Sequence, residues 1–311
     1  MTALAQPSTT LADLSGSAGR KFKDRLATTL VYGSFLVALI PLVWLLWTVI
    51  SRGAYAMTQS GWFNTSQAGI TYRDAGGGAL NAIIGTVEQV ALCAAISVPI
   101  AILVAIYLVE YGRGPLARAA TFMVDILTGI PSIVAALFIY AVFVTTFGGV
   151  RSGWLVSLAL VMLMIPVVVR TTEEMLKLVP NELREASYAL GVPKWKTIVK
   201  IVIPTATSGI VTGIVLGVAR VAGETAPLLI LVGYSQYDNW NLFGGPQGSL
   251  PGMIRDQFAN LGSTTILQHG HKVTVHHAAD RMWGAALTLI ILVMVLNLVA
   301  RFIARRSKIS S

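Results

Sequence analysis

The sequence has little charge and almost no cysteine. Charged residues make up 12% of its 311 positions, about half the share found in an ordinary globular protein. The one cysteine, Cys93, lies in an apolar run, which excludes a disulfide framework and disfavours a metal or redox centre there. Because 55% of the residues are hydrophobic, this composition predicts an all-α protein that crosses a membrane several times.

The sequence also lacks a nucleotide-binding loop and a catalytic constellation. No G-x-x-x-x-G-K-[S/T] occurs, so the chain has no loop of its own to cradle the phosphates of ATP. The segment 191–197 (GVPKWKT) ends in a similar way but lacks the second glycine. No Ser-His-Asp set and no paired carboxylates suit catalysis, and we predict a non-enzymatic chain without a cofactor. If ATP drives this protein, another chain must bind it.

Six apolar runs are long enough to cross a membrane, for which about 20 residues suffice. They lie at roughly 30–50, 80–108, 119–147, 154–170, 206–232 and 283–303. An even number of spans puts both termini on the same side. The predicted division is a cytoplasmic tail (1–28), a first span with an outer loop (29–79), a five-helix core (80–303) and a short cytoplasmic tail (304–311).

The basic residues select the side on which the termini lie. Most of the 23 lysines and arginines fall in segments that this topology places in the cytoplasm, as the positive-inside rule requires. The net charge of +9 then reflects topology and contact with anionic lipid, and nucleic-acid binding is not needed to explain it. A cleaved signal peptide is the alternative for the first run, but about 21 apolar residues are too long for one.

Residues 185–204 (EASYALGVPKWKTIVKIVIP) form a basic polar segment between two apolar runs. Apolar residues within 181–190 recur at the spacing of one helix face. Gly191 follows where a left-handed helix end is needed, and Pro193 can open the next helix because its missing N–H costs nothing there. The pattern predicts a helical hairpin on the inner face of the membrane, where it docks a soluble partner.

This segment resembles the EAA loop of ABC-importer permeases. The family pattern is EAA, three residues, Gly, nine residues and I-x-L-P. Here Glu185, Ala186, Ser187, Gly191 and the end of 201–204 match it, with Ser in place of the second Ala and Ile in place of Leu. The resemblance implies that the loop at 171–205 carries a cytoplasmic coupling helix, which docks on a separate ATPase and passes its closure to the membrane domain.

The fifth apolar run contains a regular series of glycines. Gly209, Gly213 and Gly217 recur every four residues, and such small residues let helices pack closely in lipid. We predict a packing seam and no substrate role for them.

Arg220 and Glu224 lie in the same run. An arginine inside a span persists only beside a partner or a wet path. Either the two residues pair with each other on one helix face, or Arg220 contacts an anion in transit while Glu224 holds or releases it. A guanidinium offers tetrahedral oxyanions a bidentate fork. Pro227 predicts a kink just beyond the charged residues.

The segment 219–229 (ARVAGETAPLL) resembles the ARxxGETAPLL motif of phosphate-importer permeases. Residues 128–134 resemble their G-[IV]-P-S-I segment, and 107–111 their Y-L-x-E-Y end of a span. The details of this resemblance favour the PstA type over the PstC type. The outer loop 233–282 is the part of the sequence that departs most from the family. The resemblance implies six transmembrane helices in a Type I (MetI-like) permease fold, in a bacterial plasma (inner) membrane. It implies phosphate passage along Arg220 and Glu224.

The same resemblance implies partners. These are a homologous permease of the PstC type, two copies of a PstB-type ATPase that bind ATP and Mg, and an external PstS-type phosphate-binding protein. Inorganic phosphate is the implied cargo. Three alternatives stay open: a permease for sulfate, molybdate or an organic solute, an ion-coupled transporter or anion channel that needs no ATPase, and an added role in sensing phosphate.

Other polar residues are weaker candidates. Arg170 ends the fourth run and is either an interfacial arginine or a second phosphate contact. Glu88, Gln89 and Asp125 lie within spans, near their ends, where we expect solvation or pairing. The four histidines, which the sequence gathers near the last run, favour a solvated outer loop over a zinc site: His269, His271, His276 and His277. No metal site is predicted.

Overall fold

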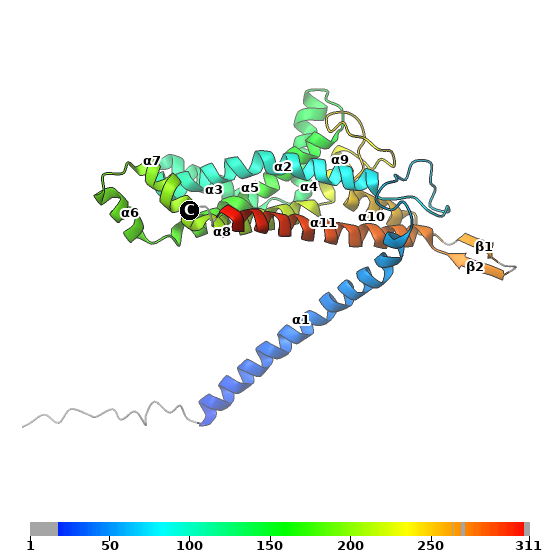
Figure 1. Cartoon of the computed structure of the whole chain (residues 1–311), viewed down its shortest axis with the longest axis horizontal. Helices are drawn as coiled ribbons and strands as arrows, with labels where there is room; N and C mark the ends of the chain where they lie inside the picture. Colours follow the sequence, from blue (N-terminus) through cyan, green and yellow to red (C-terminus); the bar gives the residue numbers. More distant parts are fainter. Residues whose placement is uncertain (1–17, 263, 269–270, 308–311) are drawn as a thin grey trace, which may run out of the picture. The chain divides into compact units, whose positions relative to one another are not determined.

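The computed structural model describes residues 18–262, 264–268 and 271–307 (Figure 1). The chain divides into two units, Met1–Ser51 and Arg52–Ser311, and each is described by itself. Among the described residues, five helices are long and apolar enough to cross a membrane, or up to six if one bent pair counts as a span. The predicted helical membrane fold is therefore confirmed.

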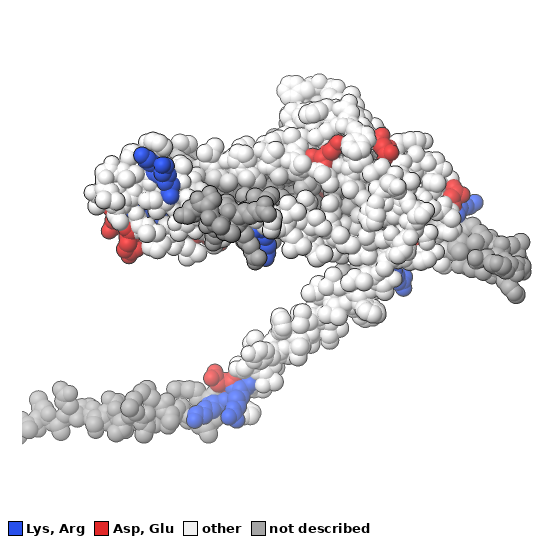
Figure 2. Space-filling model, viewed as in Figure 1, with Lys and Arg blue, Asp and Glu red and all other residues white. Residues whose placement is uncertain are grey.

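The first unit consists of most of helix α1 (Ala18–Thr58). Only 6% of its most apolar stretch is buried, although its residues are apolar on all sides. Figure 2 shows basic side chains gathered where the described helix begins, at Lys21, Lys23 and Arg25. A long helix that is apolar all round is typical of a membrane span. The predicted span at 30–50 is thus the middle of a longer helix.

The second unit contains the remaining elements. They are α2 (Leu80–Ile106), the π-helical turn η2 (Tyr107–Tyr111), α3 (Pro115–Gly129), α4 (Ser132–Ile139), η3 (Tyr140–Thr146), α5 (Gly153–Lys177), α6 (Asn181–Ala189), α7 (Lys194–Thr197), η4 (Ile198–Val202), α8 (Ile203–Ala222), α9 (Ala226–Leu231), α10 (Leu250–Ala259), β1 (Thr264–Gln268), β2 (His271–Val275) and α11 (His277–Ser307).

Helix α5 is the centre of this unit. Of its most apolar stretch 67% is buried, against 22% for the stretch in α2 and η2. It packs against α2 and α8, and α8 in turn packs against α11 (Figure 1). Val156, Met164 and Val168 of α5 are fully enclosed. Because lipid is as apolar as these side chains, close packing rather than exclusion of water holds the helices together.

The three regularly spaced glycines of α8 lie against α5. A Cβ on Gly213 would stand 2.1 Å from the hydroxyl oxygen of Thr171, and one on Gly209 would stand 2.1 Å from the sulfur of Met175. Gly217 continues the contact one turn further along. The absence of side chains on this face is what lets the two helices approach so closely.

The predicted third span, 119–147, is a bent pair rather than one helix. α3 and α4 meet at an angle of 108°, and the segment α4–η3 leaves the direction of α3 (Figure 1). Ile130 is extended, with φ −71° and ψ 125°. It precedes Pro131, and the residue before a proline is sterically driven out of the helical region. This local clash ends α3.

The predicted fifth span, 206–232, is interrupted as well. A continuous helical stretch runs from Lys194 to Ala222, and the chain then leaves the helix before α9 begins at Ala226. Pro227 has no N–H to continue the ladder of hydrogen bonds. A kink was predicted beyond the charged residues, but the interruption falls at Glu224 itself.

The predicted outer loop, 233–282, is more ordered than its turn-forming sequence suggests. It contains α10 and an antiparallel hairpin in which β1 pairs with β2. Gln247 is fully buried. Its amide nitrogen donates to the carboxylate of Glu88, and its amide oxygen accepts from Nε2 of Gln89 at 2.9 Å. Glu88 and Gln89 of α2 are therefore paired with this segment, as expected of intramembrane polar groups.

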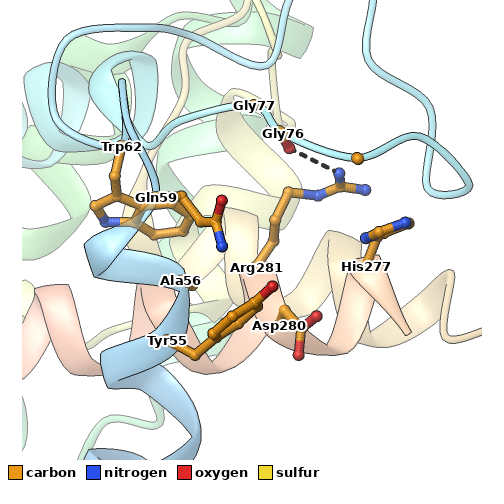
Figure 3. A pocket seen from close by; sticks show the side chains of 10 residues that line it. Tyr55, Ala56, Gln59, Trp62, Gly76, Gly77, His277, Asp280 and Arg281 are labelled. Atoms are coloured by element: carbon orange, nitrogen blue, oxygen red, sulfur yellow. Dashed lines mark hydrogen bonds between the residues drawn. The ribbon is translucent and has the colours of Figure 1, made fainter. Parts of the chain in front are cut away.

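Arg281 of α11 ties two long segments together (Figure 3). Only 4% of the residue is exposed. Its Nε donates to Gln257 at 2.9 Å, and its Nη1 to the carbonyl oxygens of Asp74 and Gly76 at 2.9 and 3.0 Å. Its Nη2 donates to the carbonyl of Thr71 at 3.0 Å. Carbonyls thus take up nearly all the donors of this guanidinium, which marks a structural role. It lines a cavity of about 80 Å³ with residues that include Tyr55, Trp62 and His277.

We predict that Gly213→Ala lowers the free energy of unfolding by about 1–3 kcal/mol, because the added methyl group has no room beside Thr171. A thiol-reactive fluorophore can follow thermal unfolding, since Cys93 is fully buried and becomes accessible when the fold opens. Gly129→Ala is the matched control, because nothing lies within 4 Å of the added atom. Equal midpoints for the two variants would contradict the packing argument.

Candidate functional site

Arg170 of α5 and Arg220 of α8 line the same cavity, whose volume is about 210 Å³. The other residues that line it are Leu127, Thr128, Leu163, Pro166, Val167 and Thr171. The two arginines therefore share a mostly apolar cavity, in which electrostatic attraction is stronger than in water. From the sequence, Arg170 was only a second candidate, and the structure brings it beside Arg220.

Arg220 differs from Arg170 in its contacts. It is exposed, and among the described residues its side chain makes no hydrogen bond or ion pair. The pair with Glu224 that the sequence left open is not formed. An arginine in a membrane helix without a protein partner is a candidate for contact with an anion or with water.

Arg170 is engaged by two carboxylates. Its Nη1 lies 2.8 Å from Oε2 of Glu173, and its Nη2 pairs with the carboxylate of Asp125 on α3. Lys177 holds the other oxygen of Glu173 at 2.7 Å. The side chains of Arg170 and Asp125 are 32% and 60% exposed, so this pair is weak. Asp125, for which the sequence suggested solvation or pairing, is thus both paired and half in the open.

Glu224 lies apart from this cavity. It stands in the break between α8 and α9, where its N–H donates to the carbonyl of Val221 at 3.2 Å. It lines a different cavity of about 10 Å³, together with Gln89 of α2. That volume is close to the least that holds one water molecule. The structure therefore does not bring the two charged residues of the 219–229 motif to one site.

The hairpin α6–α7 forms a second candidate site. Gly191 has φ +74°, a left-handed conformation that costs a glycine nothing. The hydroxyl of Ser187 lies 2.8 Å from that of Thr197, and this buried hydrogen bond joins α6 to α7. The resemblance placed Ser187 among the residues that couple to the ATPase, as a conservative departure from the EAA pattern, but the residue is buried. Its hydroxyl has a partner that an alanine could not bind.

The tip of this hairpin is apolar and open to solvent. Leu190 is 83% exposed and Trp195 is 63% exposed, and Glu185 and Ala186 are exposed beside them. Single exposed apolar residues are common, but a group of them on one small knob is typical of an interaction surface. The hairpin can therefore bury apolar area against a partner.

An ion pair that the sequence does not predict lies at the base of this hairpin. Arg184 of α6 pairs with Glu110 of η2 at 2.9 Å. Glu110 belongs to the Y-L-x-E-Y segment, but nothing in the local sequence connects it with a residue 74 positions away.

Only part of the histidine cluster lies within the described residues. His269 lies outside the described residues, as does the side chain of His271. In the part of the chain that the structure describes, no group of three or more His, Cys, Asp or Glu side chains is placed to hold a metal ion.

Comparison with known families gives a match over residues 97–308, to the family described as "Binding-protein-dependent transport system inner membrane component". The chain is 52% identical to the phosphate transport system permease protein PstA 1 of Mycobacterium tuberculosis (strain ATCC 25618 / H37Rv), over 93% of this chain and 91% of the relative. It is 38% identical to the PstA protein of Pasteurella multocida (strain Pm70), over 93% and 97%.

Solved structures share the fold at low sequence identity. A chain of a bacterial ABC transporter that imports the acidic polysaccharide alginate aligns with a TM-score of 0.60, at 15% identity, over 92% of this chain and 99% of that one. A chain of the inward-facing MetNI methionine ABC transporter aligns with a TM-score of 0.52, at 20% identity, over 73% and 92%. The chain therefore belongs to the binding-protein-dependent transport inner membrane components and, within them, to the family of the PstA permeases.

Proposed function

We propose that this chain is the transmembrane permease subunit of an ATP-driven importer of inorganic phosphate. The observation that carries the proposal is the cavity in which Arg170 and Arg220 lie together, with Arg220 free of any described partner. The names of the relatives support the cargo, since the proteins that are 38% to 52% identical are phosphate transport system permeases.

The two arginines suit an anion that must both enter and leave. A guanidinium donates two parallel hydrogen bonds to a tetrahedral oxyanion. Asp125 competes for Arg170, so a phosphate that reaches the cavity meets one free arginine and one that must exchange partners. Such a site binds strongly enough to admit the ion and weakly enough to release it. Glu224, in the break that follows α8, lowers the positive potential of the path without occupying the cavity.

The orientation follows from charge. Lys194, Lys196 and Lys200 lie on the hairpin side, and the positive-inside rule assigns that side to the cytoplasm. Both termini lie there as well, and the basic start of α1 contacts anionic lipid. In this orientation the segments 59–79 and 233–276 face the exterior, where a phosphate-binding protein delivers the ion.

In this proposal the chain provides the path for the ion and carries out no bond-breaking chemistry. The exposed tip at Leu190 and Trp195 docks on an ATPase, whose dimer binds ATP and Mg. Closure of the ATPases pushes the hairpin, and a homologous permease forms the other wall of the path. Because the guanidinium fork also fits sulfate and molybdate, competition of these anions with radiolabelled phosphate tests the cargo.

Arg220→Gln should reduce phosphate uptake about 10- to 100-fold, because hydrogen bonds to a charged group contribute roughly 1.5–3 kcal/mol each. Arg220→Lys keeps the charge but lacks the fork, so it should retain only part of the uptake. The measurement is uptake into liposomes by the assembled complex, with ATP hydrolysis followed in parallel and expected to persist. Arg118→Gln, an exposed arginine outside the cavity, is the control.

Normal uptake by Arg220→Gln would refute the assigned role. A variant that fails to assemble with its ATPase would show instead that Arg220 serves the fold.

Gly191→Val should weaken the association with the ATPase about tenfold, because a β-branched residue at positive φ costs roughly 1–3 kcal/mol. Nothing lies within 4 Å of a Cβ built at this position, so the effect comes from the backbone alone. Gly191→Asn is the matched control, since asparagine tolerates the left-handed conformation. Copurification of the ATPase measures both, and equal loss in the two variants would contradict the argument.

A further inference from the structure

Arg184 of α6 connects three elements at the base of the hairpin. Its Nε and Nη2 lie 3.1 and 2.9 Å from Oε1 of Glu110 in η2, the turn that continues α2. Its Nη2 also donates to the carbonyl of Leu176 at 3.0 Å, and its Nη1 to the carbonyl of Val179 at 2.6 Å. The carbonyl of Leu176 lies in the last turn of α5, and that of Val179 lies two residues beyond the end of this helix. One side chain thus joins α6 to the ends of α2 and α5.

This ion pair differs from the others in its burial. The side chains of Arg184 and Glu110 are only 12% and 5% exposed, whereas Arg170 and Asp125 are 32% and 60% exposed. A buried pair whose partners are also hydrogen-bonded has a fixed geometry, and removal of one member leaves an uncompensated charge. Arg184 is therefore a rigid connection.

The second helix of the hairpin is attached to the same turn. The ammonium group of Lys194, on α7, donates to the backbone carbonyl of Glu110. It also lies 4.6 Å from the centre of the Tyr111 ring, within range of a cation–π interaction. Both helices of the hairpin thus contact η2, and η2 is a π-helical turn, a local distortion that is frequent at functional positions.

We propose that Arg184 and Glu110 are positioning residues that transmit movement of the hairpin α6–α7 to α2 and α5. The proposal rests on the proposed function, because it assumes that an ATPase moves the hairpin. α5 carries Arg170, less than two turns before Leu176, so a displacement of the hairpin moves one wall of the cavity. α2 packs along α5 and is displaced with it. Without the ion pair, the hairpin still moves with the ATPase, but this movement no longer displaces the wall of the cavity.

The first test measures coupling in the full complex, reconstituted in liposomes with its ATPase, partner permease and external binding protein. Arg184→Gln and Glu110→Gln should each keep ATP hydrolysis while the phosphate moved per ATP falls about tenfold, within the range of measured coupling between contacting residues. The double variant should be no worse than either single one, because both act through one contact. Arg113→Gln, an exposed arginine close to Glu110 in sequence, is the control.

A purely structural role predicts a different result. The variants would then assemble in lower yield, but every complex that forms would move as much phosphate per ATP as the unaltered protein. An unchanged ratio of phosphate moved to ATP hydrolysed in the variants would overturn the proposal. So would a fall of this ratio in the double variant that equals the product of the falls in the two single variants.

The second test does not depend on the cargo. Hydrogen exchange of the backbone amides at 107–112 is measured in the same complex with and without ATP. We expect ATP to change this exchange in the unaltered protein and to leave it unchanged in Arg184→Gln. If ATP still changes the exchange at 107–112 in Arg184→Gln, the coupling role of Arg184 is contradicted, while the proposed function is not. A complex that responds to ATP but moves no phosphate contradicts the proposed function and leaves the coupling role standing.

Discussion

A guanidinium group without a partner is costly in free energy in a membrane protein, and the roles of four arginines follow from how each one is paired. Arg281 meets this cost with backbone carbonyls, and Arg184 meets it with a buried carboxylate. Arg170 is held by carboxylates that are partly open to solvent. Arg220 has no described partner and faces a cavity. The first two arginines hold the structure together, while the last two are the ones that we propose to receive an anion.

Helix α5 connects the two candidate sites. One face meets the glycines of α8, which bring Arg220 close enough to share a cavity with Arg170. At the C-terminal end of α5, Arg184 of the hairpin donates hydrogen bonds to the carbonyl of Leu176 and, just beyond the helix, to that of Val179. Because a packed interior is stiff and transmits displacement, movement at one end of α5 is felt at the other. We therefore propose that the most buried helix of the unit is also the mechanical link between the hairpin and the cavity that Arg170 and Arg220 line.

Much of this fold could be predicted from the sequence, because apolar length and turn residues are local signals. The hairpin needed only Gly191 and Pro193, and the helical spans needed only hydropathy. The bend of 108° at Pro131 was missed because a proline marks a break but not the direction of the next helix. The contacts of Arg184 with Glu110 and of Gln247 with α2 join residues far apart in the chain, and no local pattern reports them. An ion pair between Arg220 and Glu224 was one of two alternatives, and it required the helix to continue past Gly223, whereas α8 ends at Ala222.

The most direct measurement is a structure of the assembled complex with phosphate trapped in the membrane domain. The account predicts density for the anion between the side chains of Arg170 and Arg220, with Asp125 displaced from Arg170. Density that lies elsewhere along the interface of the two permeases, with Arg220 pointing away from it, would contradict the central claim.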